Sequence, residues 1–440
     1  MPDASGFDIP FAEVRELQVA AMNERLCERG EKIKLVKHRA EEAEIGEIRS
    51  FEDIVPLLLP HTAYKSYPES FVTDKRWDRL TKWLATTYAY PIDNVDLDGI
   101  EDIDEWIERL GAGGHHLSCS SGTTGKSAML IATEADLAFA AEDGIISVEW
   151  GSDIRRGDMR SFLSSGGGGA NTRRTRLSGQ AMMEAFIDPS KPPPPSSGKP
   201  ITIGRIANMI AMRKAVADGT AKPNEIAAYE AESVERQTNL ENAIVLAAED
   251  AIAKRHDRLF IPGMWGSIYQ LAKEVRDRGY SGKDFHPENA LYLAGGLKRA
   301  KLPPDFKEFV YETFNISPRF IHQIYSMQEI ASGMIRCQDG GRYHIPPWLV
   351  CLPLNKEGDA LLPDIGEGTV EGRAAFFDLS MDGRWGGVIS GDHIHVDYGT
   401  CACGNRSPSI REDIYRYSDL EGDDKIACSG TVDAYVRGMV

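Results

Sequence analysis

The chain has 440 residues, enough for one large core or for two to three domains. Its content of 42% hydrophobic and 27% charged residues is that of an ordinary soluble globular protein. The formal net charge of −17 disfavours nucleic acid and anionic membranes as main partners, because an acidic surface repels a polyanion.

The sequence carries no signal for export or membrane insertion. No apolar run approaches the roughly 18–20 residues that cross a bilayer, and residues 1–6 have neither a basic start nor a hydrophobic stretch. We therefore expect a cytoplasmic protein. The seven cysteines are an odd number in a large chain, which favours reduced thiols or metal ligands over a disulfide framework.

The first part of the chain, to about residue 89, reads as helical. Apolar residues recur at spacings of three and four from Phe11 to Glu28 and again over residues 77–88. Between these runs, Ser50 is a plausible N-cap, with Glu52 and Asp53 in the first turn of a short helix.

Residues 115–150 contain a short apolar segment, a glycine-rich turn and a helical run over 134–143. This order predicts a strand, a phosphate-binding turn and a helix, because glycines free backbone N–H groups to face a phosphate and Lys126 adds positive charge. A Walker A loop would need glycine where Ser120 stands, and no Walker B partner is evident. A flexible turn without a ligand is the bland alternative. The turn consists of Ser120, Ser121, Gly122, Thr123, Thr124, Gly125, Lys126 and Ser127.

The middle of the chain predicts helices and one buried strand. The arginines 173, 174 and 176 would reach a phosphate, but we interpret them as a solvated basic face. Residues 203–278 read as mostly helical, and residues 289–296 as a buried strand that ends in a Gly-Gly turn. After residue 335 short strands alternate with turns, which indicates a β-rich subdomain over 335–420.

Four segments together resemble a known superfamily. The glycine-rich turn resembles the signature loop of adenylate-forming enzymes, which include acyl-CoA synthetases, peptide-synthetase adenylation domains and luciferases. Residues 325–329 (Tyr-Ser-Met-Gln-Glu) resemble the Tyr-Gly-x-Thr-Glu motif of that superfamily, and residues 390–392 (Ser-Gly-Asp) its Thr-Gly-Asp motif. Gly295 and Gly296 stand where it has a glycine turn beside adenine. The segments follow one another in the order of the superfamily.

Within the superfamily, the chain looks most similar to phenylacetate–CoA ligases and to the acyl-protein synthetases of bacterial luminescence. This resemblance rests on Ser-Phe-Glu-Asp-Ile at 50–54 and on Cys-Ala-Cys-Gly at 401–404. It is thin between about residues 151 and 253.

The resemblance implies an α/β fold with a large N-terminal lobe. That lobe would contain two related sheet subdomains sandwiched by helices and a distorted β-barrel near residues 335–415. Residues 1–334 would form the AMP-binding core with its helix-rich middle, and 421–440 the remnant of a hinge. The hinge departs from the family pattern at Glu421, where arginine is usual. We expect the mobile C-terminal domain, with its catalytic lysine, to be missing.

The resemblance also assigns roles to individual residues. Thr123, Thr124 and Lys126 would hold the phosphates of ATP, and Glu329 would bind Mg²⁺. Tyr325 would stack on adenine, and Asp392 would accept hydrogen bonds from ribose hydroxyls. Taken alone, Glu329 would more often be a surface charge and Asp392 a turn residue. The other residues expected to contact the nucleotide are Ser120, Ser121, Gly122, Gly125, Gly295 and Gly296.

The cysteines raise two further hypotheses. Cys337, His344, Cys401 and Cys403 supply the four N/S ligands that suit structural Zn²⁺, and some phenylacetate-ligase-like proteins resemble this set; reduced thiols are the alternative. Cys428 stands where the luminescence synthetases carry an acyl-accepting cysteine, and a packed thiol is the alternative there.

Three functions remain open from the sequence. The leading one is ATP-dependent activation of a carboxylic acid as its acyl-adenylate, followed by transfer to a thiol of CoA, a carrier protein or a protein cysteine. The second is a catalytically weak nucleotide-binding subunit of a larger complex, and the third a phosphoryl-transfer ATPase. Relatives are often dimers, so a homodimer stays open, but the sequence does not show the oligomeric state. The apolar residues 260–266 hint at an aryl or fatty acid, although an ordinary core explains them equally well.

Overall fold

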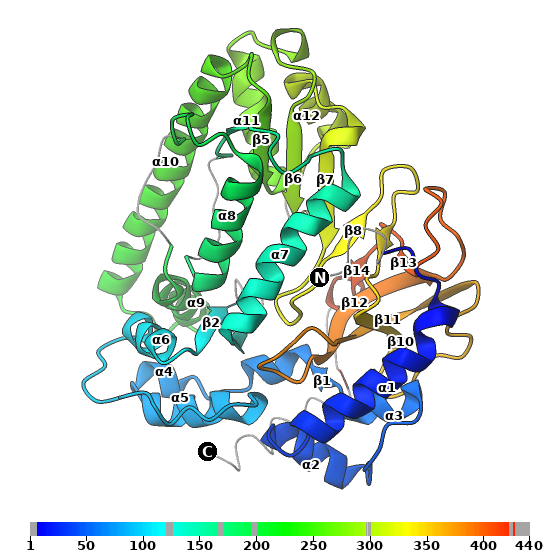
Figure 1. Cartoon of the computed structure of the whole chain (residues 1–440). Helices are drawn as coiled ribbons and strands as arrows, with labels where there is room; N and C mark the ends of the chain where they lie inside the picture. The colour runs from blue at the N-terminus through cyan, green and yellow to red at the C-terminus, as the bar shows by residue number, and fades with distance from the viewer. Residues whose placement is uncertain are drawn as a thin grey trace.

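The computed structural model describes residues 7–119, 126–165, 171–194, 201–295, 297, 301–421 and 426. Figure 1 shows an α/β protein with helices around a large sheet, as predicted. No helix in these ranges combines the length and the apolar character needed to span a bilayer.

The N-terminal region is helical, as its periodicity predicts. The two periodic runs form α1 (Phe11–Arg29) and α5 (Trp77–Leu84). Ser50 caps α3 (Phe51–Ile54), and its amide donates to the Asp53 carboxylate at 2.9 Å. The remaining helices of this region are α2 (Lys34–Glu42), α4 (Ser70–Thr73), α6 (Ile103–Ala112) and the 3₁₀ turns η2 (Val55–Leu57), η3 (His61–Lys65) and η4 (Ala85–Thr87).

The predicted phosphate turn joins two strands rather than a strand and a helix. β2 (His116–Cys119) pairs antiparallel with β3 (Met129–Ala132), and only then does α7 (Glu134–Gly151) begin. The apolar run before α7 is long enough to form a strand of its own, which the sequence reading did not separate from the helix.

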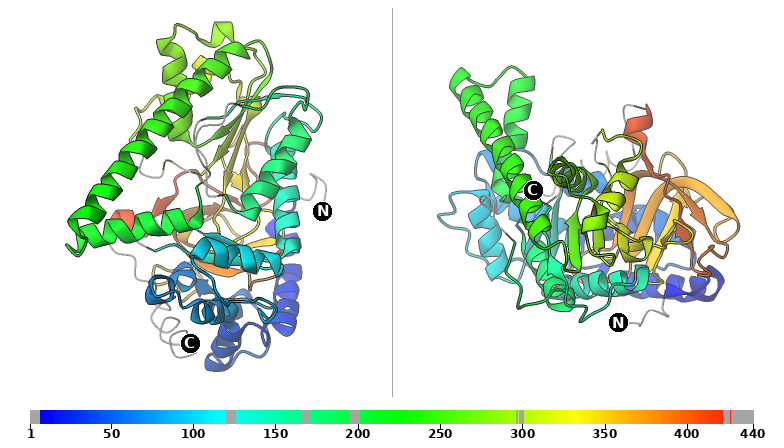
Figure 2. Two further views of the ribbon diagram at one scale, coloured as in Figure 1. Left: turned by 90° about the vertical axis from the view of Figure 1, so that its left-hand side faces the viewer. Right: turned by 90° about the horizontal axis from the view of Figure 1, so that it is seen from above.

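Four parallel strands form one half of the large sheet. Their side chains alternate between two cores: Leu259 and Ile261 pack toward α10, α11 and α12, whereas Phe260 packs toward α7 and α8. Figure 2 shows α10 running along the outer side of this half. The elements are β4 (Ser161–Phe162), β5 (Leu259–Gly263), β6 (Ala290–Ala294), β7 (Ile321–Tyr325), α8 (Arg173–Phe186), α9 (Ile203–Ala217), α10 (Pro223–Ala253), α11 (Trp265–Asp277), α12 (Phe306–Phe314), η5 (Gly282–Asp284) and η6 (Pro318–Phe320).

The other half of the sheet is mainly antiparallel. Val350 and Phe377 face the core that the N-terminal helices cover, whereas Cys351 and Phe376 face a second core. The strands are β8 (Met334–Arg336), β9 (Tyr343–His344), β10 (Leu349–Leu354), β11 (Thr369–Asp378), β12 (Gly387–Asp397), β13 (Ser409–Ile410) and β14 (Tyr415–Arg416), with β1 (Leu59–Pro60) parallel to β12 and α13 (Tyr417–Glu421) at the end.

The two halves are one continuous sheet in the order β10-β11-β12-β13-β9-β8-β7-β6-β5-β4. The halves are joined where β7 pairs directly with β8, with Ile324 opposite Ile335. The predicted boundary at 334/335 falls inside β8, so the division into domains stays a prediction. β5 also interrupts the run over 203–278 that we expected to be helical.

Candidate functional site

Two of the predicted nucleotide residues meet at one edge of the sheet. Tyr325 ends β7, and its hydroxyl donates to Asp392 Oδ2 on β12 at 2.8 Å. Removal from water, followed by the Asp392 charge, raises the pKa of the Tyr325 hydroxyl, so it remains a donor. Arg416 lies opposite Asp392 on β14, with its Nε 3.6 Å from Asp392 Oδ1. The carboxyl ends of parallel strands are the usual ligand edge of an α/β sheet.

Glu329 follows four residues after Tyr325 in the connection between β7 and β8. It is half-buried, and loss of solvent raises the pKa of its carboxyl while the charges of Arg384 and Lys65 oppose this rise. The pKa of Lys65 itself is lowered by burial, although the Glu329 charge works in the opposite direction. A carboxylate in such a place suits Mg²⁺, which takes oxygen ligands from one or two carboxylates and from substrate phosphates.

The sequence reasoning missed the three cations around these acids, Lys65, Arg384 and Arg416. Each is a single basic residue outside any motif, so no pattern singled it out. Their proximity to Glu329 and Asp392 arises only when η3, β14 and the turn after β11 come together.

The structure describes the last two residues of the phosphate turn, Lys126 and Ser127. Lys126 donates to the carbonyl oxygen of Tyr67, and its ammonium lies 4.3 Å from the centre of the Tyr67 ring. Gly295 follows β6 with φ +82°, a value that favours glycine, and stands next to the end of β7 because Ala294 pairs with Ile324. The residues that the sequence predicts for these sites and that lie outside the described ranges are Ser120, Ser121, Gly122, Thr123, Thr124, Gly125, Gly296 and Cys428.

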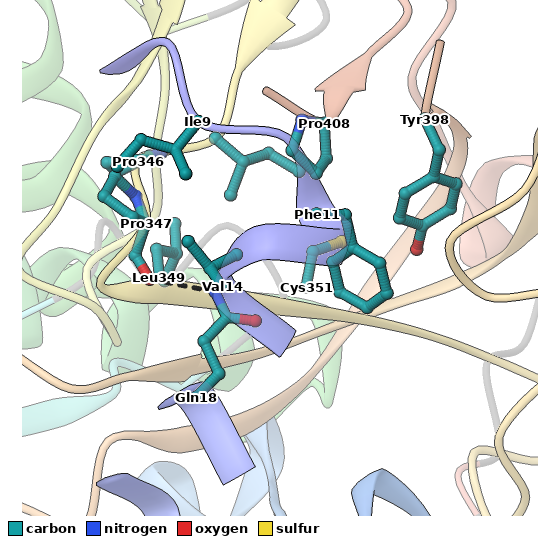
Figure 3. Close-up of a pocket in the computed structure, with 11 residues that line it drawn as sticks. Ile9, Phe11, Val14, Gln18, Pro346, Pro347, Leu349, Cys351, Tyr398 and Pro408 are labelled. Atoms are coloured by element: carbon teal, nitrogen blue, oxygen red, sulfur yellow. Dashed lines mark hydrogen bonds between the residues drawn. The ribbon is translucent and has the colours of Figure 1, made fainter. Parts of the chain in front are cut away.

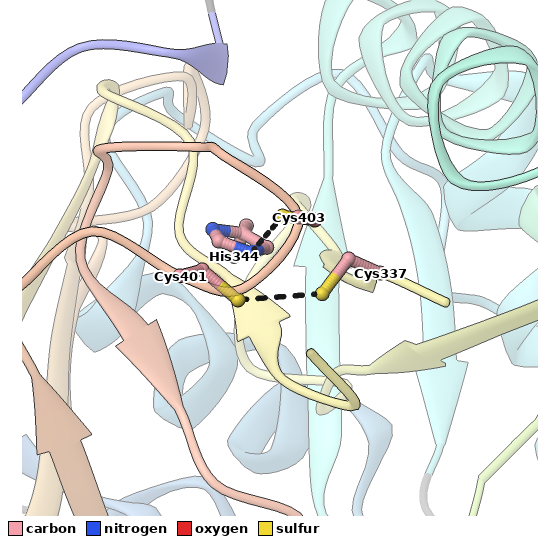
Figure 4. A group of neighbouring side chains, drawn as sticks. All are labelled: Cys337, His344, Cys401 and Cys403. Carbon is pink, nitrogen blue, oxygen red and sulfur yellow. Dashed lines mark hydrogen bonds between the residues drawn. The ribbon is translucent and has the colours of Figure 1, made fainter. Parts of the chain in front are cut away.

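The structure brings the four predicted metal ligands together. Cys337, His344, Cys401 and Cys403 place one ligand atom each within 4.8 Å of all the others (Figure 4). The Sγ atoms of Cys337 and Cys401 are 3.6 Å apart, and Cys403 Sγ is 3.4 Å from His344 Nε2. Three sulfurs and one imidazole nitrogen in one buried cluster are a donor set that zinc takes in structural sites.

The backbone at Gly340 lies so close to two of the sulfurs that a side chain there would collide with them. A Cβ atom at Gly340 would overlap Cys401 Sγ and lie 3.1 Å from Cys337 Sγ. Desolvation raises the pKa of the Cys337 thiol, but hydrogen bonds from His344 and from the Arg342 backbone outweigh it and lower that pKa to about 6. A thiolate that forms this readily is the form that binds metal.

The arginines of α8 differ from the sequence interpretation. Arg173 lies on the surface and pairs with Glu134, with Nη2 and Oε1 2.6 Å apart. Arg174 instead turns inward, where its Nη2 donates to the carbonyl oxygen of Ile330 at 3.2 Å. The solvated basic face is therefore wrong for Arg174, because neighbouring residues of a helix point in different directions.

A small enclosed cavity of about 20 Å³ lies elsewhere, between α1 and the antiparallel half of the sheet (Figure 3). Its walls are mainly apolar and include Phe11, Val14 and Leu349, with Gln18 and Tyr398 as polar members. The volume suits about one water molecule rather than an organic acid. Phe260 and Trp265, which we considered as walls for the acid, belong to the buried core.

Comparison with known proteins gives a likeness at the level of the fold. No family profile matches the sequence, and no curated protein sequence matches it. Solved structures of 2-hydroxyisobutyryl-CoA ligase do match, among them the following three, each at 12% identity. An open form in complex with 2-HIB-AMP and CoA has a TM-score of 0.57 and covers 94% of this chain and 73% of its own.

The two other structures agree with the first. The postadenylation state in complex with R3-HIB-AMP has a TM-score of 0.56 and covers 98% of this chain and 74% of its own. The thioesterification state, in complex with 2-HIB-AMP and CoA, has a TM-score of 0.58 and covers 94% of this chain and 72% of its own. The chain thus shares its fold with 2-hydroxyisobutyryl-CoA ligase over nearly its whole length, which confirms the predicted α/β fold class.

Proposed function

We propose that this protein uses ATP to activate a carboxylic acid as its acyl-adenylate and then passes the acyl group to a thiol. The observation that carries the proposal is the meeting of Tyr325, Asp392 and Glu329 at the ligand edge of a sheet with this fold. Tyr325 and Glu329 come from one segment that resembles a superfamily motif, and Asp392 comes from another. The two segments lie far apart in the sequence.

In the first step, a carboxylate oxygen of the acid attacks the α-phosphorus of ATP. The new C–O–P link forms as the bond to the β-phosphate breaks, and pyrophosphate leaves. Asp392 would accept hydrogen bonds from the ribose hydroxyls, and Tyr325 would lie against adenine. Thr123, Thr124 and Lys126 would hold the phosphates. Negative charge grows on phosphoryl oxygens, so positioned donors and cations lower the barrier most.

Mg²⁺ would supply charge neutralisation on the phosphates, and Glu329 would be its protein ligand. Lys65 and Arg384 add positive potential around Glu329. In the second step, a thiolate attacks the acyl carbonyl and AMP leaves, as expected for covalent chemistry at sulfur. CoA or a carrier-protein thiol would accept the acyl group, with Cys428 as an acceptor within the chain.

The cluster of Cys337, His344, Cys401 and Cys403 would hold a structural zinc ion. Cys337 follows β8, His344 lies in β9, and Cys401 and Cys403 lie in the loop between β12 and β13, so a metal ion would join these three segments. Zinc analysis of protein purified without chelator tests this. About one equivalent is expected, and less than about a tenth of an equivalent would contradict a zinc site.

The experiment that tests adenylation is ATP–pyrophosphate exchange with Mg²⁺ and a panel of aryl, fatty, hydroxy and amino acids. We expect exchange that depends on one class of acid and that falls at least about 100-fold in Glu329→Ala, because this substitution removes charge stabilisation from the transition state. Glu312→Ala is the matched control, since Glu312 is exposed on α12, away from this edge.

Other outcomes would replace the proposal. Tight ATP binding without exchange for any acid would indicate the nucleotide-binding subunit. Release of orthophosphate instead of pyrophosphate would indicate a phosphoryl-transfer ATPase.

A further inference from the structure

The segment that carries Glu329 is held by an unusual set of side chains. Residues 328–333 connect β7 to β8, and their backbone groups have no strand partner over most of this length. Buried backbone N–H and C=O groups need hydrogen-bond partners. Here four ionisable side chains from distant parts of the chain provide them, namely Asp143, Arg174, Asp378 and Arg384. We call these four the clamp.

The two arginines of the clamp bind the carbonyl groups of the segment. Arg384 Nη1 donates to the carbonyl oxygen of Glu329 at 3.0 Å, and its Nη2 is 3.5 Å from that of Gln328. Arg174 Nη2 donates to the next carbonyl, that of Ile330. Three consecutive carbonyl groups therefore face cations.

The two aspartates bind the amides that follow. Asp378 Oδ2 accepts from the amides of Ala331 at 2.8 Å and Ser332 at 3.0 Å. Asp143 Oδ2 accepts from the amide of Gly333 at 3.2 Å. The carbonyl groups of residues 328–330 thus face guanidinium groups and the amides of residues 331–333 face carboxyl oxygens, so the clamp fits the backbone in one direction only.

These charges are costly to bury. Asp378 is fully buried, and Asp143 and Arg384 are 4% and 2% exposed. Buried ionic groups contribute little to stability compared with apolar residues of similar size, but they fix one geometry when all their hydrogen bonds are made. Such a device is worth its cost where a catalytic group must be placed within about 0.5 Å.

We propose that the clamp positions Glu329 for the nucleotide and its metal ion, and that Arg174 is the positioning residue through which α8 reaches the site. This inference rests on the proposed adenylation. Arg174 acts through the carbonyl of Ile330, the residue that follows Glu329. A shift of about 1 Å at such a position can cost about 100-fold in rate.

Arg174→Met keeps the length of the side chain but removes its donors. We expect it to slow ATP–pyrophosphate exchange about 10- to 100-fold and to raise the Mg²⁺ concentration for half-maximal rate. Arg174→Lys, which retains a charged donor group, should partly restore both the exchange rate and the Mg²⁺ dependence. The matched control is Arg173→Met, because Arg173 is the preceding residue of α8 and pairs with Glu134 at the surface. It should leave both quantities within about twofold.

A double-mutant cycle decides whether Arg174 acts through Glu329. If it does, Arg174→Met combined with Glu329→Ala should be no slower than Glu329→Ala alone. The proposal is overturned if the fold-reductions in rate of the two single variants multiply in the double variant. It is also overturned if Arg174→Met loses no more activity than Arg173→Met.

Hydrogen exchange of the peptide covering 328–336 gives a readout that needs no catalysis. Its amides should exchange at least about tenfold faster in Arg174→Met than in the parent or in Arg173→Met, because a lost anchor opens the segment locally. Unchanged hydrogen exchange would refute the clamp. If the parent catalyses no ATP–pyrophosphate exchange with any acid, the adenylation proposal fails, and the hydrogen-exchange measurement still tests the clamp on its own.

Discussion

Two irregular segments of the protein are held in place in opposite ways. The Cys/His cluster draws one atom each from Cys337, His344, Cys401 and Cys403 toward a single point. The segment 328–333 is held instead along its length, by hydrogen bonds between four ionisable side chains and successive backbone groups. The Cys/His cluster is a convergent site, which should lose its metal when one ligand is lost. The segment 328–333 is a distributed site, in which loss of one side chain should have a smaller effect because the others remain. The following substitutions test that difference.

The largest effect is expected at the convergent site. Cys401→Ser removes one of three sulfurs from a buried cluster and should abolish stoichiometric zinc binding. It should also lower the free energy of unfolding by more than about 3 kcal/mol, since loss of a structural metal is among the most costly changes a fold undergoes. Zinc analysis and urea unfolding measure both. Cys27→Ser is the control, because Cys27 is exposed on α1. Full zinc content in Cys401→Ser would contradict the convergent description.

A smaller effect at the same site is expected from Gly340→Ala. The added Cβ would overlap Cys401 Sγ, so the β8–β9 turn must move away from the ligands. We expect zinc affinity, measured by competition with a chelating dye, to fall about 10- to 100-fold, the usual cost of disturbing the support of a metal ligand. Gly46→Ala serves as the control, because nothing lies within 4 Å of a Cβ there. Equal affinities for the two variants would show that the turn is not part of the site.

The smallest effect is expected at the distributed site, from Asp143→Asn. Burial raises the pKa of Asp143 to about 7, above its usual 3.8, despite the hydrogen bond from Gly333. The folded protein therefore holds this proton more tightly than the unfolded chain. The resulting stability is fully present below about pH 4 and is lost as the pH rises through 7.

Asparagine keeps an oxygen for the Gly333 amide but has no proton to lose. The difference in free energy of unfolding between Asp143→Asn and the parent, measured in urea, should therefore change by about 1–3 kcal/mol in favour of the variant as the pH rises from 5 to 8. Glu142→Gln, on the same helix and 42% exposed, should show no such trend. A parallel pH dependence in the parent and in Asp143→Asn would mean that Asp143 carries its charge without cost.

Much of the fold could be predicted from local patterns. The periodicity of α1 and α5, the Ser50 cap and the buried strand β6 were correct because each depends on residues within a few positions of one another. The continuity of the sheet was not predicted. The pairing of β7 with β8 depends on how the 326–333 turn is anchored, and its anchors are more than 40 residues away along the chain.

The sequence by itself determined which residues have the chemistry for the two sites. Residue type and spacing are enough to single out cysteines, a histidine and the residues of a motif. Tyr325, Glu329, Asp392 and the four cluster residues could therefore be predicted from the sequence. Only the tertiary structure decided what holds them. An aspartate or an arginine looks the same in sequence whether it faces water or a buried amide. The roles of Asp143, Arg174, Asp378 and Arg384 therefore arise from the packing of α7, α8 and β11 around one short segment.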